Sequence, residues 1–138
     1  MSLRTRIGSR TLRRRAFLEM LFTPEFLAAR SSDELAARLA PVIGRDLADQ
    51  PAILMKQLKA LRAYDRSDRM AALSRIPTLI LSAEKDPIAL PQYGVHLSQL
   101  ISGSRYVEFP GAAHGVTLQE PEQINAMLQG HFTQAEQP

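Results

Sequence analysis

The sequence contains no cysteine and no tryptophan, and its apolar residues never form a long run. Without cysteine the chain has no disulfide bond, no thiolate metal site and no cysteine nucleophile. A membrane-spanning helix needs roughly 20 consecutive apolar residues, and no stretch approaches that length. The N-terminal arginines are not followed by an apolar segment, so we expect no secretory signal and a cytoplasmic protein.

A serine flanked by glycines is also missing. None of the serines has glycine two residues before it and two residues after it, so the G-x-S-x-G turn that exposes a nucleophilic serine is absent from these 138 residues. No spacing of histidines and carboxylates is typical of a metal site, so we expect no bound metal. The sequence therefore contains no recognisable nucleophile.

The chain is long enough for about one domain, since 45% of its 138 residues are hydrophobic. Its net charge is +3, and the positive excess lies near the N-terminus in Arg4, Arg6, Arg10, Arg13, Arg14 and Arg15. No aromatic residues alternate with these arginines, so a basic tail or helix end is favoured over nucleic-acid binding. An arginine-rich start also resembles an organellar transit peptide, but the helical pattern continues smoothly from it.

The first half of the sequence is predicted to be helical. Thr23 and Pro24 supply an N-cap and a preset first residue for a helix over 25–30. Ser31-Ser32-Asp33-Glu34 has the spacing of a capping box before a second helix, and a third helix begins near Pro51. The faces expected to be buried are Leu35, Leu39 and Val42 in the second helix and Leu54, Leu58 and Leu61 in the third.

The second half shows a different pattern. Residues 77–82 form a short apolar run typical of a strand buried on both faces, and residues 105–109 form a second strand. A helix that begins at Pro91 and ends at Gly103 connects them, which predicts a βαβ unit with parallel strands. A last helix opens at Glu120-Pro121. The faces expected to be buried are Tyr93, Leu97, Leu100 and Ile101 in the first helix and Ile124, Met127, Leu128 and Phe132 in the last.

Asp86 and His114 are the candidate site residues, because each comes just after one of the two predicted strands. The carboxyl ends of parallel strands meet at one edge of a sheet, so an acid and a histidine placed there can converge on a single site. Taken singly, Asp86 could instead cap a turn before Pro87. His114 could likewise lie in a tight loop of small residues without any chemical role.

Two segments, I-P-T-L-I-L-S-A-E-K-D-P-I-A-L-P and R-Y-V-E-F-P-G-A-A-H-G, resemble the C-terminal part of α/β-hydrolases over about residues 70–133. The helical stretch before them, with Tyr64-Asp65 and Arg69, is similar to the cap of the esterase, lactonase and haloperoxidase-like branch. The resemblance implies a partial α/β fold. It consists of a cap-like segment over 1–70, a core segment with two parallel strands over 71–133, and a polar tail over 134–138, without the family's N-terminal sheet and nucleophile elbow.

Carried over from this resemblance, Asp86 is the acid of a catalytic triad and His114 is its general base. The carboxylate would accept the Nδ1 proton and fix the histidine tautomer, which leaves Nε2 to take a proton from a nucleophile. The implied parent reaction is hydrolysis of a small ester or lactone without a cofactor. Because the serine and the oxyanion donors are missing, we expect the chain to be inactive alone.

The sequence leaves two interpretations open: a C-terminal fragment or truncated relative of a hydrolase, and a non-catalytic interaction module that uses an exposed sheet edge. An isolated two-stranded sheet is marginally stable, so we expect helices or a second copy in a homodimer to cover that edge. Glu84 and Lys85 either flank the turn that carries Asp86 or are simply residues of a solvated loop, and the sequence leaves both open. His96 and His131 are expected to be surface or capping residues rather than ligands.

Overall fold

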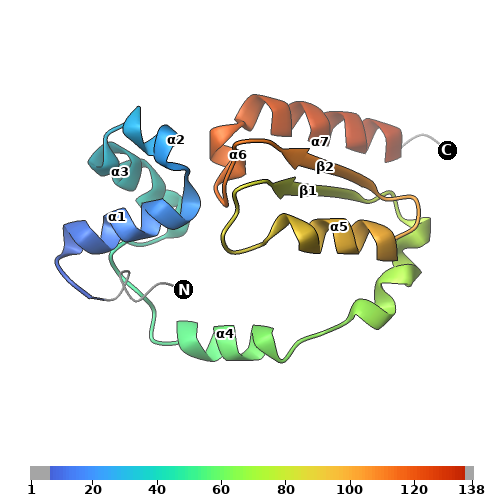
Figure 1. Cartoon of the computed structure of the whole chain (residues 1–138), viewed down its shortest axis with the longest axis horizontal. Coiled ribbons are helices and arrows are strands. Elements are labelled where there is room, and N and C mark those ends of the chain that lie inside the picture. Colours follow the sequence, from blue (N-terminus) through green and yellow to red (C-terminus); the bar gives the residue numbers. More distant parts are fainter. Residues whose placement is uncertain (1–6, 136–138) are drawn as a thin grey trace. The chain divides into compact units, whose positions relative to one another are not determined.

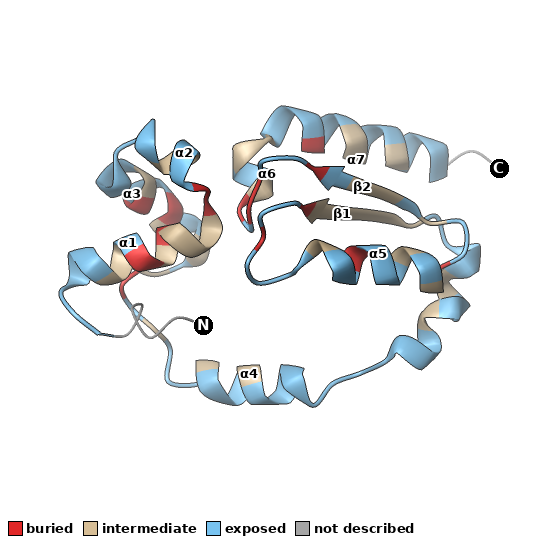
Figure 2. Ribbon diagram, in the orientation of Figure 1, coloured by how far each residue is buried: buried red, intermediate tan, exposed pale blue. Residues whose placement is uncertain are grey.

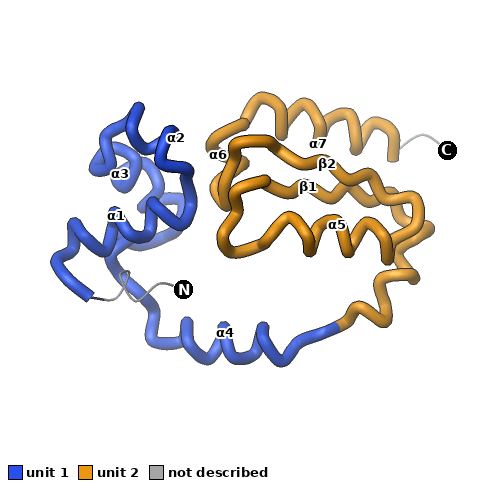
Figure 3. The backbone as a smooth tube through the Cα atoms, in the orientation of Figure 1, with its two compact units in different colours: residues 1–65 blue, residues 66–138 orange. Residues whose placement is uncertain are grey.

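The computed structural model describes residues 7–135. The chain divides into two compact units, residues 1–65 and residues 66–138 (Figure 3). Among the described residues, no helix has the length and apolar character to cross a membrane. The elements follow the order α1 (Arg10–Leu21), α2 (Pro24–Ala28), α3 (Ser32–Ile43), α4 (Leu54–Arg62), the 3₁₀ helix η2 (Ser67–Arg75), β1 (Leu79–Ala83), α5 (Pro91–Leu100), β2 (Arg105–Phe109), α6 (Val116–Gln119) and α7 (Pro121–Ala135) (Figure 1).

Hydroxyl side chains begin the first three helices. The hydroxyl of Ser9 accepts a hydrogen bond from the N–H of Leu12 at the start of α1. Thr23 caps α2 and Ser31 caps α3 in the same way, each accepting from the backbone N–H three residues later. These contacts satisfy N–H groups that have no partner inside the helix. The predicted helix starts at Thr23-Pro24 and at Ser31 are therefore confirmed.

Helices α1–α3 pack around a small apolar core. Its buried residues are Leu18, Phe22, Ala36, Leu39 and Leu47 (Figure 2). Leu39 is buried as predicted, but the prediction for Val42 is wrong, because 77% of Val42 is exposed. The residue of α3 that packs against the core after Leu39 is Ile43, four positions further along the helix, and not Val42 at three positions.

Helix α4 does not pack as its apolar stripe predicts. None of its residues is buried, and Leu61 is 66% exposed. The expectation that Leu54, Leu58 and Leu61 form a core face is therefore wrong. Amphipathic spacing determines which face of a helix is apolar, but a second surface must be present to bury that face.

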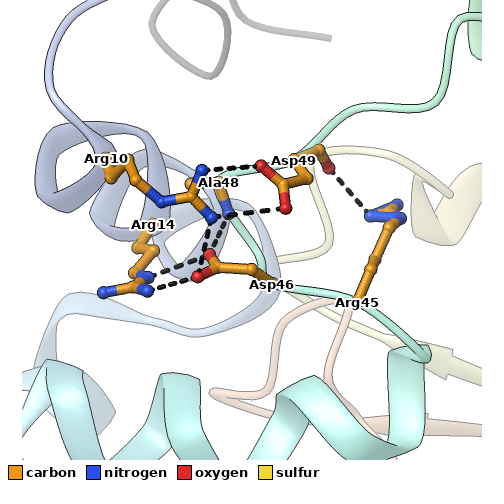
Figure 4. Close-up of polar contacts among 6 residues, drawn as sticks. All are labelled: Arg10, Arg14, Arg45, Asp46, Ala48 and Asp49. Atoms are coloured by element: carbon orange, nitrogen blue, oxygen red, sulfur yellow. Dashed lines mark hydrogen bonds and ion pairs between the residues drawn. The ribbon is translucent and has the colours of Figure 1, made fainter.

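Two arginines of the basic N-terminal cluster are paired with aspartates (Figure 4). Arg10 contacts Asp46 at 3.0 Å and Asp49 at 3.0 Å, and the guanidinium of Arg14 binds both oxygens of Asp46. Asp46 also accepts a hydrogen bond of 2.8 Å from the N–H of Ala48. These contacts join α1 to the segment after α3. Arg4 and Arg6 lie outside the described residues.

The second unit is built on the predicted βαβ arrangement. Strands β1 and β2 are parallel, with a register that runs from Leu79 opposite Arg105 to Ala83 opposite Phe109. Helix α7 covers one face of this sheet through Ile124, and helix α5 covers the other (Figure 1). The resulting three layers confirm a partial α/β fold with two parallel strands.

The prediction for helix α5 is confirmed only at its C-terminal end, where Leu100 is half-buried and Ile101, just after the helix, is 4% exposed. Within the helix the buried residue is Gly94, whereas Tyr93 is 56% exposed and Leu97 is 37% exposed. A Cβ atom at Gly94 would come within 2.1 Å of the Ser82 hydroxyl oxygen and 2.9 Å of the Tyr106 ring. The absence of a side chain lets the helix backbone approach the strands, and this close approach decides the orientation of the helix.

The last helix agrees with the prediction along most of its length. Ile124 is buried and Met127 and Leu128 pack beside it, but Phe132 is 60% exposed. A helix of 15 residues is about 22 Å long and a strand of five residues about 17 Å. The final turn of α7 therefore extends beyond the strands that bury its earlier turns. The short helices η2 and α6 were not predicted from the sequence.

Two helical glycines give opposite predictions for substitution by alanine. Gly94→Ala should destabilise the second unit by about 1–3 kcal/mol, because the new methyl group overlaps Ser82 and Tyr106. Gly130→Ala in α7 should stabilise it by about 0.5–1 kcal/mol, because no atom lies within 4 Å of the new Cβ and alanine favours the helix. Urea unfolding of both variants measures the two changes. Equal effects at the two positions would contradict the close packing of α5.

The ion pairs of Asp46 predict a loss of stability in acid. The guanidinium of Arg14 and the N–H of Ala48 hold the pKa of this carboxyl below its usual value of 3.8. A lowered folded-state pKa stabilises the folded chain at pH values above the unfolded pKa, and the contribution is lost as pH falls below it. The free energy of unfolding should therefore decline below about pH 4 less steeply in Asp46→Asn than in the original chain. The measurement is urea unfolding at a series of acidic pH values. An equally steep decline of the free energy of unfolding in the two chains would contradict this prediction.

Candidate functional site

Asp86 lies in a tight turn directly after β1. The N–H of Asp86 donates to the carbonyl of Ala83 at 3.1 Å, which closes the turn. Its Oδ1 atom accepts hydrogen bonds from the N–H groups of Ile88 at 2.7 Å and Ala89 at 2.9 Å. Asp86 is 7% exposed. One carboxylate oxygen therefore holds the chain that leads into α5, and the other oxygen, Oδ2, is available for another partner.

That partner is His114. Its Nδ1 atom lies 2.8 Å from Oδ2 of Asp86. An ionised carboxylate can only accept hydrogen bonds, so the proton of the contact lies on Nδ1 and the neutral ring has its lone pair on Nε2. The histidine side chain is 37% exposed, whereas that of Asp86 is 8% exposed. The two residues that the sequence places after successive strands are thus brought together, with the acid covered and the histidine accessible.

The two loops that carry these residues are joined by hydrogen bonds. The N–H of Glu84 donates to the carbonyl of Phe109 at 3.1 Å, and the N–H of Lys85 donates to the carbonyl of Ala112 at 2.8 Å. In the opposite direction, the N–H of Gly111 donates to the carboxylate of Glu84 at 2.7 Å. The strand pairing therefore continues beyond the sheet into the loops and fixes the spacing of Asp86 and His114.

A second side chain also holds the histidine loop. The N–H of Ala113 donates to the side-chain oxygen of Gln119 in α6 at 2.8 Å. Gln119 was not among the predicted site residues, and for Glu84 the sequence left open both a place beside the acid turn and a solvated loop. The sequence feature that could have pointed to this loop is Gly111, because glycine is typical of tight turns. In the structure Gly111 has a φ of +71°, a conformation that favours glycine.

The remaining histidines lie away from the pair. His96 is exposed on α5, and His131 lies on α7 with its ring beside that of Phe132. Within residues 7–135, no three side chains of the kinds that bind metals form a cluster. The site therefore consists of one carboxylate, one histidine and the backbone groups that orient them.

In α/β-hydrolases the acid precedes the histidine along the chain, after the nucleophile, and Asp86 and His114 follow that order. The family model described as alpha/beta hydrolase fold matches residues 4–121. The chain therefore belongs to the α/β-hydrolase fold family.

Individual relatives share part of this chain. The AB hydrolase superfamily protein YisY of Bacillus subtilis strain 168 is 38% identical over 69 residues, which are 50% of this chain and 25% of YisY. RutD of Klebsiella pneumoniae strain 342, named for a proposed carbamate hydrolase activity, is 36% identical over 75 residues, which are 54% of this chain and 28% of RutD.

The fold is similar to solved structures over almost all of the chain. The crystal structure of the enol-lactonase from Burkholderia xenovorans LB400 matches with a TM-score of 0.71 and 22% identity, and the match covers 95% of this chain and 48% of the lactonase. The chain thus spans about half of that structure, and its matches to YisY and RutD span about a quarter of each. These matches support a partial α/β-hydrolase fold.

Proposed function

We propose that this chain supplies the acid and the general base of a hydrolase that acts on a small ester or lactone. The proposal rests on one observation, the contact of 2.8 Å between His114 Nδ1 and Asp86 Oδ2. Asp86 holds its position because its other oxygen is bound to two backbone N–H groups. A carboxylate fixed in this way orients the imidazole and stabilises the imidazolium that forms during proton transfer.

In the proposed reaction His114 acts through Nε2. This nitrogen takes the proton of an attacking hydroxyl group as the nucleophile bonds to the substrate carbonyl, and it later returns a proton to the leaving alcohol. Asp86 remains ionised throughout and binds the Nδ1 proton. Residues 1–138 include no G-x-S-x-G turn, so a nucleophile and oxyanion donors of the usual kind must come from other polypeptide.

The choice of substrate class rests on similarity. The name of the solved relative with a TM-score of 0.71 is that of an enol-lactonase, and RutD is named for a carbamate. Lactones, esters and carbamates share an acyl carbon bonded to oxygen, and a hydroxyl nucleophile with a histidine base can attack all three. We assign the ester and lactone class because the structural match covers 95% of this chain.

An esterase assay tests the need for an external nucleophile. The purified chain should have no His114-dependent activity: it and its His114→Ala variant should hydrolyse p-nitrophenyl acetate at the same background rate. A fusion in which the chain replaces the matching half of the enol-lactonase should hydrolyse the lactone, with His114→Ala lowering kcat by about 10²–10⁴-fold.

His96→Ala is the matched control, because this histidine is exposed on α5. Circular dichroism confirms that each fusion is folded. A folded, active fusion that is insensitive to His114→Ala would contradict the assignment of the base. Turnover by the chain alone that depends on His114 would reveal a nucleophile within these residues.

A second candidate function is self-association through the free edge of β1. The residues of β1 are all uncharged and include no proline, so β1 lacks the charges and prolines that commonly block edge pairing. Strand β2, in contrast, has Arg105 and Glu108. The composition of the two edges favours pairing at β1.

The hydrogen-bond pattern of β1 is self-complementary. Thr78 accepts from Arg105 and Glu84 donates to Phe109, so every second residue of this segment faces β2. Leu79, Leu81 and Ala83 then direct their backbone groups to the free edge. Antiparallel pairing of two copies about a two-fold axis at Leu81 would match donors to acceptors and would close after two chains, as in an isologous dimer.

Engineered cysteines test this dimer, because the natural chain has none. Leu81→Cys should form an intermolecular disulfide under mild oxidation, since residues opposite each other in a hydrogen-bonded antiparallel pair have Cα atoms about 5.5 Å apart. Val107→Cys, on the same face and opposite Leu81 in β2, should not, because three strand spacings of about 4.8 Å separate the two copies. Non-reducing gels read the result, and equal cross-linking or a monomer at every concentration would contradict the dimer.

A further inference from the structure

We infer that Glu84 is a positioning residue for His114, acting on the histidine through the loop between β2 and α6. This inference rests on the proposed role of the Asp86–His114 pair. The carboxylate of Glu84, at the end of β1, reaches the N–H of Gly111 at 2.7 Å. Gly111 lies three residues before His114, so the contact joins the acid loop to the histidine loop beside the site.

Within the histidine loop a single backbone bond spans Pro110 and Gly111, from the N–H of Ala112 to the carbonyl of Phe109, and at 3.4 Å it is long for such a bond. Glu84 N–H binds the carbonyl of Phe109, and Lys85 N–H binds the carbonyl of Ala112. Between these two points the chain passes through Pro110 and Gly111. Gly111 has a φ of +71°, and no atom lies within 4 Å of a Cβ placed there. Packing therefore does not hold this residue, and glycine has the widest backbone freedom of any residue.

The Glu84 carboxylate adds a second and shorter contact to this turn, at the N–H of Gly111. A hydrogen bond to an ionised acceptor is shorter and stronger than one between neutral groups, and the length of 2.7 Å agrees with this. Glu84 and Gly111 are both exposed, so water competes for the contact and its contribution to global stability is small. Its main effect is to restrict the conformation of Gly111, and so the path of the chain toward His114.

Two side chains then hold the loop at two of its N–H groups. Glu84 binds the N–H of Gly111 from the β1 end, and Gln119 binds the N–H of Ala113 from α6 at 2.8 Å. His114 is the next residue after Ala113. With both N–H groups held, the imidazole remains within hydrogen-bond distance of Asp86 and its proton stays on Nδ1. Release of Gly111 should lengthen this contact in part of the population and allow the tautomer with the proton on Nε2.

Nitrogen-15 NMR of the full chain tests the inference without any turnover. The variants are Glu84→Ala, which removes the acceptor, and Glu84→Gln, which keeps a carbonyl oxygen at the same place. Glu108→Ala is the matched control, because Glu108 is another exposed glutamate of the second unit and its carboxylate binds the hydroxyl of Tyr106 on the same strand. The measurements are the ring nitrogen shifts of His114 above pH 8 and the hydrogen exchange of the Gly111 amide.

Glu84→Ala should raise the exchange rate of the Gly111 amide at least about tenfold, the change expected when an exposed hydrogen bond is lost. It should also increase the Nε2-protonated fraction of His114. Glu84→Gln, whose acceptor is present but neutral, should restore both values in part, and Glu108→Ala should match the original chain. An unchanged tautomer in a folded Glu84→Ala chain would overturn the inference. If that variant does not fold, Glu84→Met, which keeps the length of the side chain, gives the same test.

The outcome separates this inference from the proposed function. If the lactonase fusion is insensitive to His114→Ala while Glu84→Ala still shifts the tautomer, the assigned reaction fails and the positioning role remains. If His114→Ala abolishes turnover while Glu84→Ala changes neither the tautomer nor kcat, the reaction is supported and the positioning role fails.

Discussion

The parallel pairing of β1 with β2 is the constraint on which the site depends. Its register places Ala83 opposite Phe109, so the two strands end together and their following loops leave the sheet at the same edge. The side chains beneath this edge are buried, which fixes the register, because a slip by one residue would turn the apolar side chains to the wrong face. Asp86 and His114 meet because they lie three and five positions after strand ends that are already aligned.

Asp86 combines two roles that the sequence presents as alternatives. Its Oδ1 atom caps the turn before α5, as Asp-Pro by itself would suggest, and its Oδ2 atom binds His114. The first role supports the second, because a carboxylate bound to two backbone amides cannot rotate freely away from the imidazole. The same logic extends to the loops, where Glu84 binds the N–H of Gly111 and Gln119 binds the N–H of Ala113. The geometry of the pair is therefore built by residues from both loops and from α6.

Helix starts and strands were predictable because their signals are local. At Thr23 and Ser31 the side-chain hydroxyl accepts a hydrogen bond from the backbone N–H three residues later. Both groups lie within one helical turn, so the sequence alone indicates the helix start. Burial was less predictable, and Val42, Leu61, Tyr93, Leu97 and Phe132 are exposed although the spacing favours their burial. Burial requires a second surface in the right place, and periodicity contains no information about that surface.

The sequence by itself determined the βαβ unit and the helix that follows it, the family to which the chain belongs, and the two candidate residues that come after the strands. These properties follow from local patterns and from motifs of adjacent residues. Only the tertiary structure decided that Gly94 sets the face of α5, that Glu84 binds Gly111, and that the aspartate divides its oxygens between a turn and a histidine. Each of these depends on distances between atoms far apart in the chain, and those distances exist only after the layers have packed.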